Sequence, residues 1–244
     1  FFYKYIFQSP QKGDINSNKK KELNQNYNNY EGKIIRKIYI LNEGPFCINR
    51  NDSVFFSQKT LNKIGNSLHI NTQSITIKNL LLFKEKDRFD SISVKESERL
   101  IRSQRYIEEG LIDGLIIENS PDSIDIVVRV KDEFSFMPEG QISSSKFSLG
   151  VREKNFLGLG QKLHSYYSWN ASGKTNNYQY DYSVPNILNS YIKTDILYRK
   201  NVIDTTETGI FSIERPFYSA LSKWGGGISI SMESQKYLIN IPNT

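Results

Sequence analysis

The stretch Tyr178-Gln179-Tyr180-Asp181-Tyr182-Ser183-Val184 alternates apolar or aromatic side chains with polar ones at every position. Successive side chains of an extended backbone point to opposite faces, so a period of two predicts a β-strand with one apolar and one polar face. A helix cannot keep this pattern on one side, because it repeats every 3.6 residues.

The same alternation continues through most of the chain after Asp132. The apolar positions of its other segments are Phe134, Phe136, Gly140 and Ile142; Phe147, Leu149 and Val151; Leu163, Tyr167 and Trp169; Ile192, Ile196 and Tyr198; and Ile228, Ile230 and Met232. They predict about seven antiparallel strands of ~8–11 residues, a length that crosses a bilayer at a tilt. Residues 133–244 are therefore expected to form strands of a transmembrane β-barrel; that they are its N-terminal part is implied only by the family resemblance given below.

Soluble antiparallel sheets also alternate, so the prediction rests on further features. Many of the 15 Tyr, 14 Phe and 2 Trp residues stand near strand ends, where rings meet the two membrane interfaces. A lipid-facing strand would direct Phe147, Tyr180, Ile196 and Ile230 outward. The polar face would line a wet lumen with Glu139, Arg152, Lys193, Asp195, Arg199 and Glu233. Ordinary solvation of a soluble sheet remains the alternative for that face.

The hydropathy and charge of the chain argue against a helical membrane protein and against a nucleic-acid-binding protein. Mean hydropathy is −0.51, and no apolar run approaches the ~20 residues that a membrane-spanning helix needs. The net charge of +6 comes largely from local runs such as Lys19-Lys20-Lys21, which is not the organised stripe typical of nucleic-acid binding.

Residues 33–132 read as a separate α/β module. Ile34 to Leu41 predict a strand; helices follow, one capped near Asn71 or Thr72 and one capped by Ser93, with Glu96 completing a capping box. Leu111–Glu118 and Ile124–Lys131 then flank a turn sequence and predict a hairpin. This order of strands and helices predicts a small mixed sheet with helices covering one face. Residues 1–32 are predicted to form a tail or linker.

Several segments carry a resemblance to a known family. They are Asn66-Ser67-Leu68-His69, Leu80–Lys84, Glu96–Arg102, Val128–Ser135, Arg152–Gly160, Val184-Pro185-Asn186 and Glu214–Ser219. In this order they resemble the last POTRA domain and the opening hairpins of the surface-antigen-type barrel of the BamA/TamA outer-membrane assembly family, in a Bacteroidetes-like form. A complete barrel of that family has many more strands, so either the chain is a fragment or another polypeptide supplies the remainder.

The resemblance implies a side for each turn. The turns at 143–146, 171–176 and about 201–206 are expected to face outward. Those at 155–160, 185–189 and 216–223 are expected to face the periplasm, together with the POTRA-like part.

The resemblance also implies a function, which is insertion or translocation of other outer-membrane proteins of a Gram-negative (diderm) bacterium by β-strand addition at a barrel seam. Unpaired sheet edges supply the main-chain groups for such addition. The candidate edge residues are Leu111, Leu115 and Ile117 in the hairpin, and Phe134, Phe136, Pro138, Gly140 and Ile142 in the first barrel strand. Proline cannot donate to a ladder, so Pro138 suits an edge. It could equally just break the strand or lie before the transmembrane part of the strand.

The expected partners are unfolded outer-membrane clients, outer-membrane lipid and accessory assembly proteins, and not nucleic acid. Two alternatives remain open: a secretion pore or passive channel of the same superfamily, and a soluble α/β-plus-β binding protein.

No residue pattern indicates an enzyme. Cys47 is the single cysteine, so it forms no intrachain disulfide or thiolate cluster, and His69 and His164 lack metal-ligand spacing. Nucleophile-elbow, phosphate-loop and metalloprotease motifs are missing from the sequence, and Gly225-Gly226-Gly227 opens a strand and not a helix. We therefore expect no catalytic residues, no metal and no cofactor.

Overall fold

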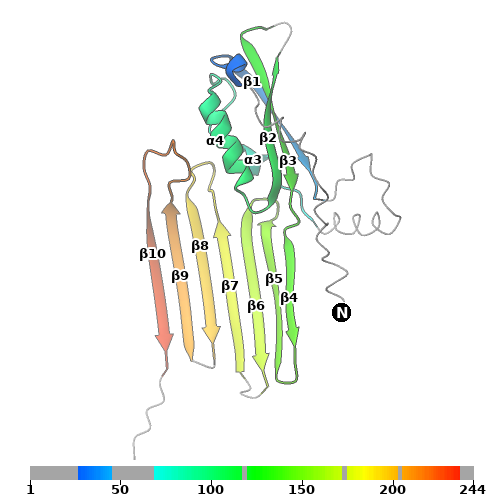
Figure 1. The fold of residues 1–244 in the computed structure, drawn as a ribbon. Helices are drawn as coiled ribbons and strands as arrows, with labels where there is room; N and C mark the ends of the chain where they lie inside the picture. The colour runs from blue at the N-terminus through cyan, green and yellow to red at the C-terminus, as the bar shows by residue number, and fades with distance from the viewer. Residues whose placement is uncertain (1–26, 46–68, 117–119, 172–174, 203–204, 237–244) are drawn as a thin grey trace, which may run out of the picture.

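The computed structural model describes residues 27–45, 69–116, 120–171, 175–202 and 205–236. They form two sheets that follow each other along the chain: a three-stranded sheet with its helices, here called the α/β unit, and a seven-stranded sheet (Figure 1). Cys47, Ile117 and most of residues 1–32 lie outside these ranges.

The small sheet has the order β1-β3-β2. β1 (Ile34–Glu43) runs parallel to β3 (Ser123–Asp132), and β2 (Ile107–Ile116) pairs antiparallel with β3. A parallel pair needs a crossover, which contains α3 (Ser74–Lys78) and α4 (Ser91–Arg102). The short 3-10 helix η2 (Tyr27–Tyr30) precedes β1.

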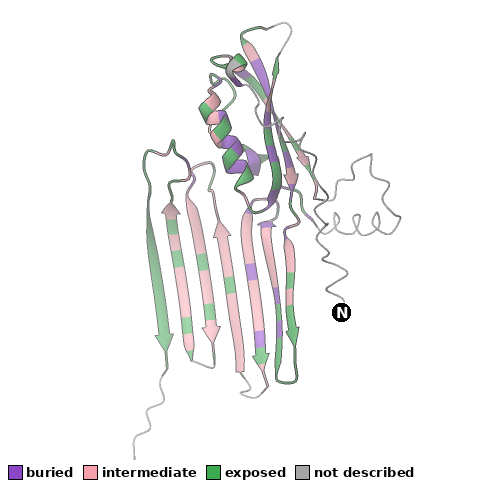
Figure 2. Ribbon diagram, viewed as in Figure 1, coloured by how far each residue is buried: buried purple, intermediate pink, exposed green. Residues whose placement is uncertain are grey.

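The core of the molecule lies between these helices and the small sheet, as the purple segments of Figure 2 show. Ile35, Ile124, Ile126 and Val128 of the sheet and Val94 and Ile101 of α4 are 0% exposed. Each such side chain contributes roughly 1.5–3 kcal/mol through burial, so this packing holds the α/β unit together.

The structure corrects the start of α4. Its N-cap is Asp90, whose carboxylate accepts hydrogen bonds from the backbone N–H groups of Ile92 and Ser93. Ser93 stands inside the first turn and donates its hydroxyl to Asp90, while Glu96 pairs with Arg99 and completes no capping box. The Ser93 hydrogen bonds hold the pKa of Asp90 below its usual value.

Two other boundaries differ from prediction. The helix expected to be capped near Asn71 or Thr72 is the five-residue α3, and its N-cap is Gln73, which makes no side-chain cap bond. Ile75, the second residue of α3, is 51% exposed. β2 begins at Ile107, four residues before the predicted start, because its bulged first residues lack regular alternation.

The large sheet is an antiparallel meander in which every strand neighbours the next along the chain. Its strands are β4 (Phe136–Ile142), β5 (Lys146–Phe156), β6 (Gln161–Asn170), β7 (Thr175–Val184), β8 (Lys193–Asn201), β9 (Thr206–Arg215) and β10 (Gly226–Gln235). The prediction of about seven strands is therefore confirmed. The sheet is open, with β4 and β10 at its edges.

The two faces of this sheet differ sharply in chemistry. Cross-strand registers place Tyr182, Ile196, Phe211 and Ile230 in one row across one face. The same face carries every large apolar strand residue that is exposed: Ile142, Phe147, Leu149, Trp169, Tyr180, Ile196, Phe211, Ile213, Ile228, Ile230 and Met232. We call it the apolar face.

The opposite, polar face is the less accessible one near β5 and β6. Ser148, His164 and Ser168 lie on it and are at most 8% exposed, whereas Phe147 and Tyr180 on the apolar face are 38% and 48% exposed. This is the reverse of a soluble sheet, which buries its apolar side. The expectation that Phe147, Tyr180, Ile196 and Ile230 stay out of a protein core is met.

The turns of the large sheet alternate between its two ends. The β5–β6, β7–β8 and β9–β10 turns lie beside the α/β unit, and the other three lie at the far end (Figure 1). This is the grouping that the sequence predicted.

Candidate functional site

The edge strand β4 is the main candidate site. It pairs with β5 and has no second neighbour in the described sheet, so one row of its backbone groups is free for another strand. Pro138, Gly140 and Ile142 lie within it and are exposed, and Phe136 is its half-exposed first residue. Pro138 stands opposite Val151 without breaking the strand, which excludes the strand-breaker reading.

Phe134 does not belong to this edge. β4 begins at Phe136, and Glu133 to Ser135 form the short connection from β3. The Phe134 ring lies 6.4 Å from the ring of His69, at the joint between the sheets. Phe134 and Phe136 both occupy apolar positions of the alternating sequence pattern, but the ladder with β5 starts only at Phe136.

The second predicted edge stands at one side of the small sheet, but side chains already bond part of it: Glu98 accepts from the Ile112 N–H, and the hydroxyls of Tyr27 and Tyr30 donate to the carbonyls of Ile112 and Gly114. β2 stands at one side of the small sheet, with Leu111 and Leu115 exposed on it. Ile117 lies outside the described residues. β1, at the other side, is an edge that the sequence analysis did not single out.

The six predicted lumen residues share the polar face. The structure brings Glu139 and Arg152 together at 2.8 Å and Lys193 and Asp195 at 2.8 Å. Arg199 lies on the same face in β8 and Glu233 in β10. Their common orientation is what the alternation predicted, whereas the pairing depends on strand register.

A side-chain network on this face was not found from the sequence. His164 of β6 places Nδ1 2.8 Å from Asp181 of β7 and Nε2 3.4 Å from Glu139 of β4. Arg152 of β5 pairs with the same Glu139, and Gln179 donates to Asp181. Four adjacent strands thus contribute to one cluster, which we call the His164 cluster (Glu139, Arg152, His164 and Asp181).

The joint between the sheets is a set of hydrogen bonds between the β5–β6 turn and the start of α3. The carbonyl of Gly158, in the β5–β6 turn, accepts hydrogen bonds from the N–H of Gln73 at 2.8 Å and from Oγ1 of Thr76 at 2.9 Å. Asn155 donates to Oγ1 of Thr72 at 2.8 Å. The start of α3 therefore rests directly on this turn.

A buried carboxylate supports the joint from the small sheet. Asp132, the last residue of β3, accepts hydrogen bonds from the N–H of Thr72 and from Asn42, and lies 3.1 Å from Nε2 of His69. The side chains of Asp132 and His69 are 0% exposed. His69, which lacks metal-ligand spacing in the sequence, thus has a structural place beside Asp132.

The other turns beside the α/β unit form a platform around Arg215. The guanidinium donates to the carbonyls of Ser190 and Trp224 and to the hydroxyl of Tyr218, and it lies 4.1 Å from the centre of the Trp224 ring. Tyr191 and Tyr218 stack with ring centres 3.7 Å apart. The β7–β8 and β9–β10 turns are thereby held as one body.

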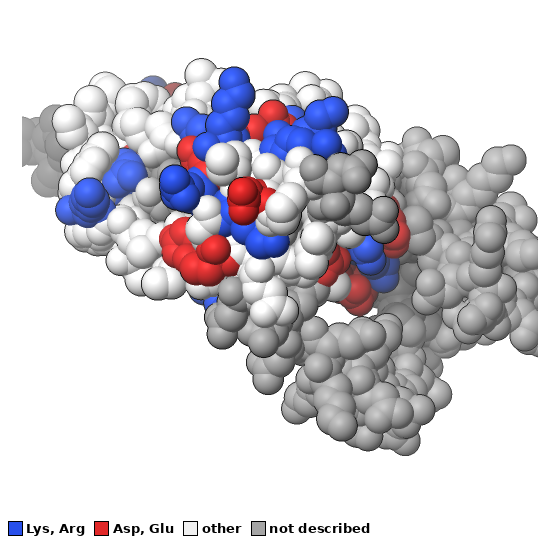
Figure 3. Space-filling view, turned by 90° about the horizontal axis from the view of Figure 1, so that it is seen from above, with Lys and Arg blue, Asp and Glu red and all other residues white. Residues whose placement is uncertain are grey.

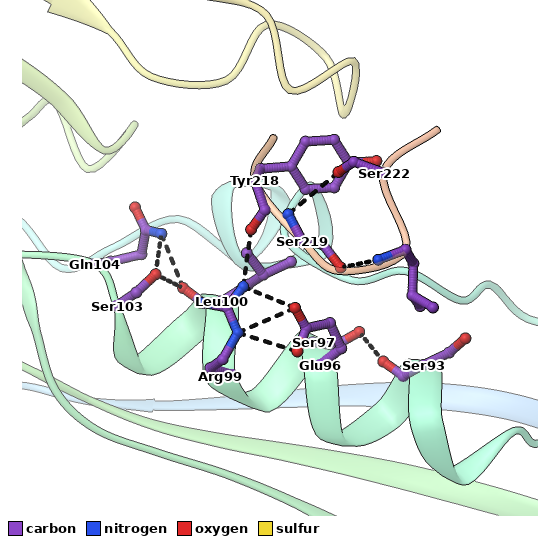
Figure 4. Close-up of polar contacts among 11 residues, drawn as sticks. Ser93, Glu96, Ser97, Arg99, Leu100, Ser103, Gln104, Tyr218, Ser219 and Ser222 are labelled. Atoms are coloured by element: carbon purple, nitrogen blue, oxygen red, sulfur yellow. Dashed lines mark hydrogen bonds and ion pairs between the residues drawn. The ribbon is translucent and has the colours of Figure 1, made fainter. Parts of the chain in front are cut away.

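This platform touches α4, as Figure 4 shows. Arg99 donates to the carbonyl of Tyr218 at 2.8 Å and pairs with Glu96. The bonds from Arg99, and next the hydroxyl of Ser219, hold the pKa of Glu96 below its usual range. The α/β unit is thus fixed to two turns at the same end of the sheet, the β5–β6 turn toward one edge and the β9–β10 turn toward the other.

The comparisons with known proteins give distant likenesses. No family model matches the chain. BamA from Haemophilus ducreyi lacking POTRA domains 1-3 is similar with a TM-score of 0.44 and 17% identity, over 75% of this chain and 31% of that one. CdiB from Acinetobacter baumannii is similar with a TM-score of 0.42 and 12% identity, over 84% and 39%. The chain spans about a third of these two structures, and likenesses this distant do not decide its function.

Other kinds of site are not seen in the described part of the chain. Those residues hold no group of three or more His, Cys, Asp or Glu side chains that could bind a metal ion. Neither do they include a helix with the length and apolarity to span a membrane.

Proposed function

We propose that this chain is part of an outer-membrane protein that inserts or translocates other outer-membrane proteins, and that β4 accepts their strands. The α/β unit would be a POTRA-like domain in the periplasm, and the large sheet the first part of a barrel wall. The observation that carries the proposal is the inverted large sheet, with its large apolar side chains exposed on one face and ion pairs gathered on the other.

An inverted sheet is unfavourable in water and favourable in a bilayer. Contiguous exposed apolar surface normally marks contact with another apolar phase. Lipid would cover the apolar face, and the ion pairs would line a wet interior. Trp169 and Trp224 stand toward opposite ends of the sheet, as interfacial rings do.

Strand addition at the open edge β4 is favourable because it pairs backbone groups that would otherwise stay unpaired in the membrane. Within hydrocarbon, an unpaired N–H or C=O costs several kcal/mol, roughly, so an incoming strand gains stability from each ladder bond it forms. Main-chain bonds do not depend on side-chain identity, so one edge can accept many clients. No covalent step is needed, and we propose that the protein is not an enzyme and uses no cofactor.

The proposed partners are unfolded outer-membrane clients, outer-membrane lipid and accessory assembly proteins. Nucleic acid is not among them. Lys and Arg side chains are interspersed with Asp and Glu on the end of the molecule viewed in Figure 3, without a stripe of one sign.

Disulfide trapping tests the proposal. In a Cys47→Ser background, Gln141→Cys places a thiol on β4, and Gln179→Cys places one on the interior strand β7 as the matched control. Each full-length variant, in lipid vesicles, is mixed under mild oxidation with an unfolded outer-membrane barrel protein carrying one cysteine in its last strand. We expect a mixed disulfide at position 141 and little at position 179.

Equal trapping at both positions, or none at position 141, would overturn the proposal. Ion conductance without trapping would favour a passive or secretory pore. A monodisperse chain without detergent or lipid would favour a soluble binding protein.

A further inference from the structure

A cavity of about 490 Å³ lies where the α/β unit meets the polar face of the large sheet. The connection from α4 to β2 (residues 103–106) lines one side of it, and β4, β5, β6, β7 and β8 supply the other. Its volume is within the range of ligand-binding sites, roughly 300–1,000 Å³. Strand addition at β4 does not use this cavity, so its chemistry needs an explanation of its own.

The charged side chains that line this cavity are mostly cations. The cations are Arg105, Arg152, Lys154, Lys162 and Lys193, and the carboxylate is that of Asp195. Three of the cations have carboxylate partners, in the pairs Arg152–Glu139, Lys154–Glu133, Lys193–Asp195 and Lys193–Glu214. Arg105 and Lys162 form no ion pair with any described residue. An anion that enters the cavity therefore meets five lining cations, two of them without a partner, and one lining carboxylate.

Tyr106, at the end of the α4–β2 connection, adds a hydrogen-bond donor to the cavity. It is 3% exposed, and its hydroxyl makes no hydrogen bond to a described residue. Gly160, which also lines the cavity, lies against this hydroxyl, because a Cβ added to Gly160 would be 2.6 Å from the Tyr106 Oη. A buried hydroxyl without a partner is costly, and an oxygen of a bound anion would accept its hydrogen.

We propose that this cavity is a binding site for the carboxylates of an acidic, extended polypeptide segment. Arg105 and Lys162 pair with carboxylates of the segment, and Tyr106 donates its hydroxyl to a carboxylate oxygen. The segment belongs to an unfolded client chain, an assignment that rests on the proposed function. The cavity thus holds the client by its side chains beside the α/β unit, apart from the main-chain pairing at β4.

The spread of the cations favours a chain over a single small anion. Arg152 and Lys154 lie in β5, Lys162 in β6 and Lys193 in β8. Neighbouring strands are ~4.8 Å apart, so these cations extend over about 14 Å, which is more than one phosphate or carboxylate spans. In an extended chain the side chains of one face recur about every 6.6 Å, so successive acidic residues contact cations of different strands.

Binding of a labelled peptide to the full-length protein in lipid nanodiscs tests this site. The probe is a short peptide of alternating Glu and Ser, and its control has Gln in place of every Glu. Fluorescence anisotropy at low ionic strength gives the dissociation constant of each peptide. We expect the Glu peptide to bind about tenfold or more tightly than the Gln peptide, and its affinity to fall as salt is added.

Variants locate the binding at the cavity. Arg105→Gln and Lys162→Gln remove cations that have no ion pair, so neither leaves a carboxylate without its partner; each should weaken binding of the Glu peptide about threefold, and both together about tenfold. Tyr106→Phe keeps the buried ring and removes only the hydroxyl, and it should weaken binding about tenfold, the factor for one hydrogen bond to a charged group. Lys146→Gln is the matched control, because Lys146 lies on the polar face at the other end of β5 and forms no ion pair with a described residue. It should bind the peptide as the unmodified chain does.

Equal binding of the Glu and Gln peptides would overturn the inference. So would unchanged binding in Tyr106→Phe, or a loss in Lys146→Gln as large as that in Lys162→Gln, because either result indicates attraction to charge without a site. Full displacement of the peptide by inorganic phosphate at constant ionic strength would make a single small anion the ligand, and would overturn the inference as well.

Peptide binding involves no strand insertion, so the two proposals fail separately. If trapping at position 141 fails while the Glu peptide binds at the cavity, the proposed function is wrong and the acidic-segment site stands. If trapping succeeds and the Glu peptide does not bind, only the acidic-segment site is wrong.

Discussion

Replacing Gly158 by alanine should loosen the joint between the α/β unit and the large sheet. Gly158 has a φ of +72°, and a Cβ there would fall well inside contact distance of the Asn71 carbonyl oxygen. Gly32 is the matched control, because its φ is +77° and nothing lies within 4 Å of an added Cβ. Both substitutions place alanine in the left-handed region, but only one pushes two backbone segments apart.

The magnitudes follow from that comparison. The left-handed conformation should cost about 1–2 kcal/mol at either position. Gly158→Ala should also disrupt the two hydrogen bonds that its carbonyl accepts from Gln73 and Thr76, adding about 1–3 kcal/mol at 0.5–1.5 each. The additional destabilisation by Gly158→Ala over Gly32→Ala corresponds to roughly a five- to 150-fold increase in the equilibrium constant for local opening of the joint.

Amide exchange of Gln73 measures this opening directly, because its N–H donates to Gly158. We expect exchange of Gln73 to accelerate by that factor in Gly158→Ala relative to Gly32→Ala, while the amides of β3 stay protected. If the two variants exchange equally at Gln73, the contact does not hold the joint and the reasoning is refuted.

Three further outcomes are expected. Asp90→Ala should lower the free energy of unfolding of the α/β unit by about 1 kcal/mol at neutral pH, because it removes the α4 cap. The hydrogen bonds from Ser93 lower the pKa of Asp90 in the folded state. The stabilisation by Asp90 is therefore fully present above the unfolded carboxyl pKa of about 3.9, and it is lost as the pH falls through the folded pKa. Denaturant titrations at pH 7 and pH 3 should show the difference in unfolding free energy between the variant and the unmodified chain shrinking, and a constant difference would contradict this prediction. Ile126→Ala should cost about 2–5 kcal/mol, since Ile126 is 0% exposed, and a cost under ~1 kcal/mol in the same titration would argue against the described core. Arg215→Lys should reduce the near-UV circular dichroism of the platform, because lysine cannot both stack on Trp224 and make three directed bonds; an unchanged spectrum would show that Arg215 does not order it.

The large sheet was the most predictable part of the fold. Alternation in segments such as Tyr178 to Val184 assigns each side chain to a face without any tertiary information, and the registers confirm those faces. Turn positions followed from the strand ends. The pairs on the polar face could not be predicted, since His164 meets residues 17 and 25 positions away only after three hairpins set their registers.

The α/β unit was less predictable near its helix starts. Asp90 and Ser93 are both competent caps three residues apart, and the Ser93–Glu96 spacing imitates a capping box. Thr72 looked like a helix cap, but its Oγ1 accepts a hydrogen bond from Asn155, 83 residues away, and its N–H donates to the buried Asp132. Local signals lose to such long-range bonds, and a single sequence does not reveal them.

The connection from β3 to β4 has a mechanical consequence. Three residues, Glu133 to Ser135, separate the central strand of the small sheet from the open edge of the large one, a reach of at most ~11 Å. So short a tether has little slack to absorb torque. Rotation of the α/β unit would therefore pull on β4, which is the shortest strand of the described large sheet and has a single ladder.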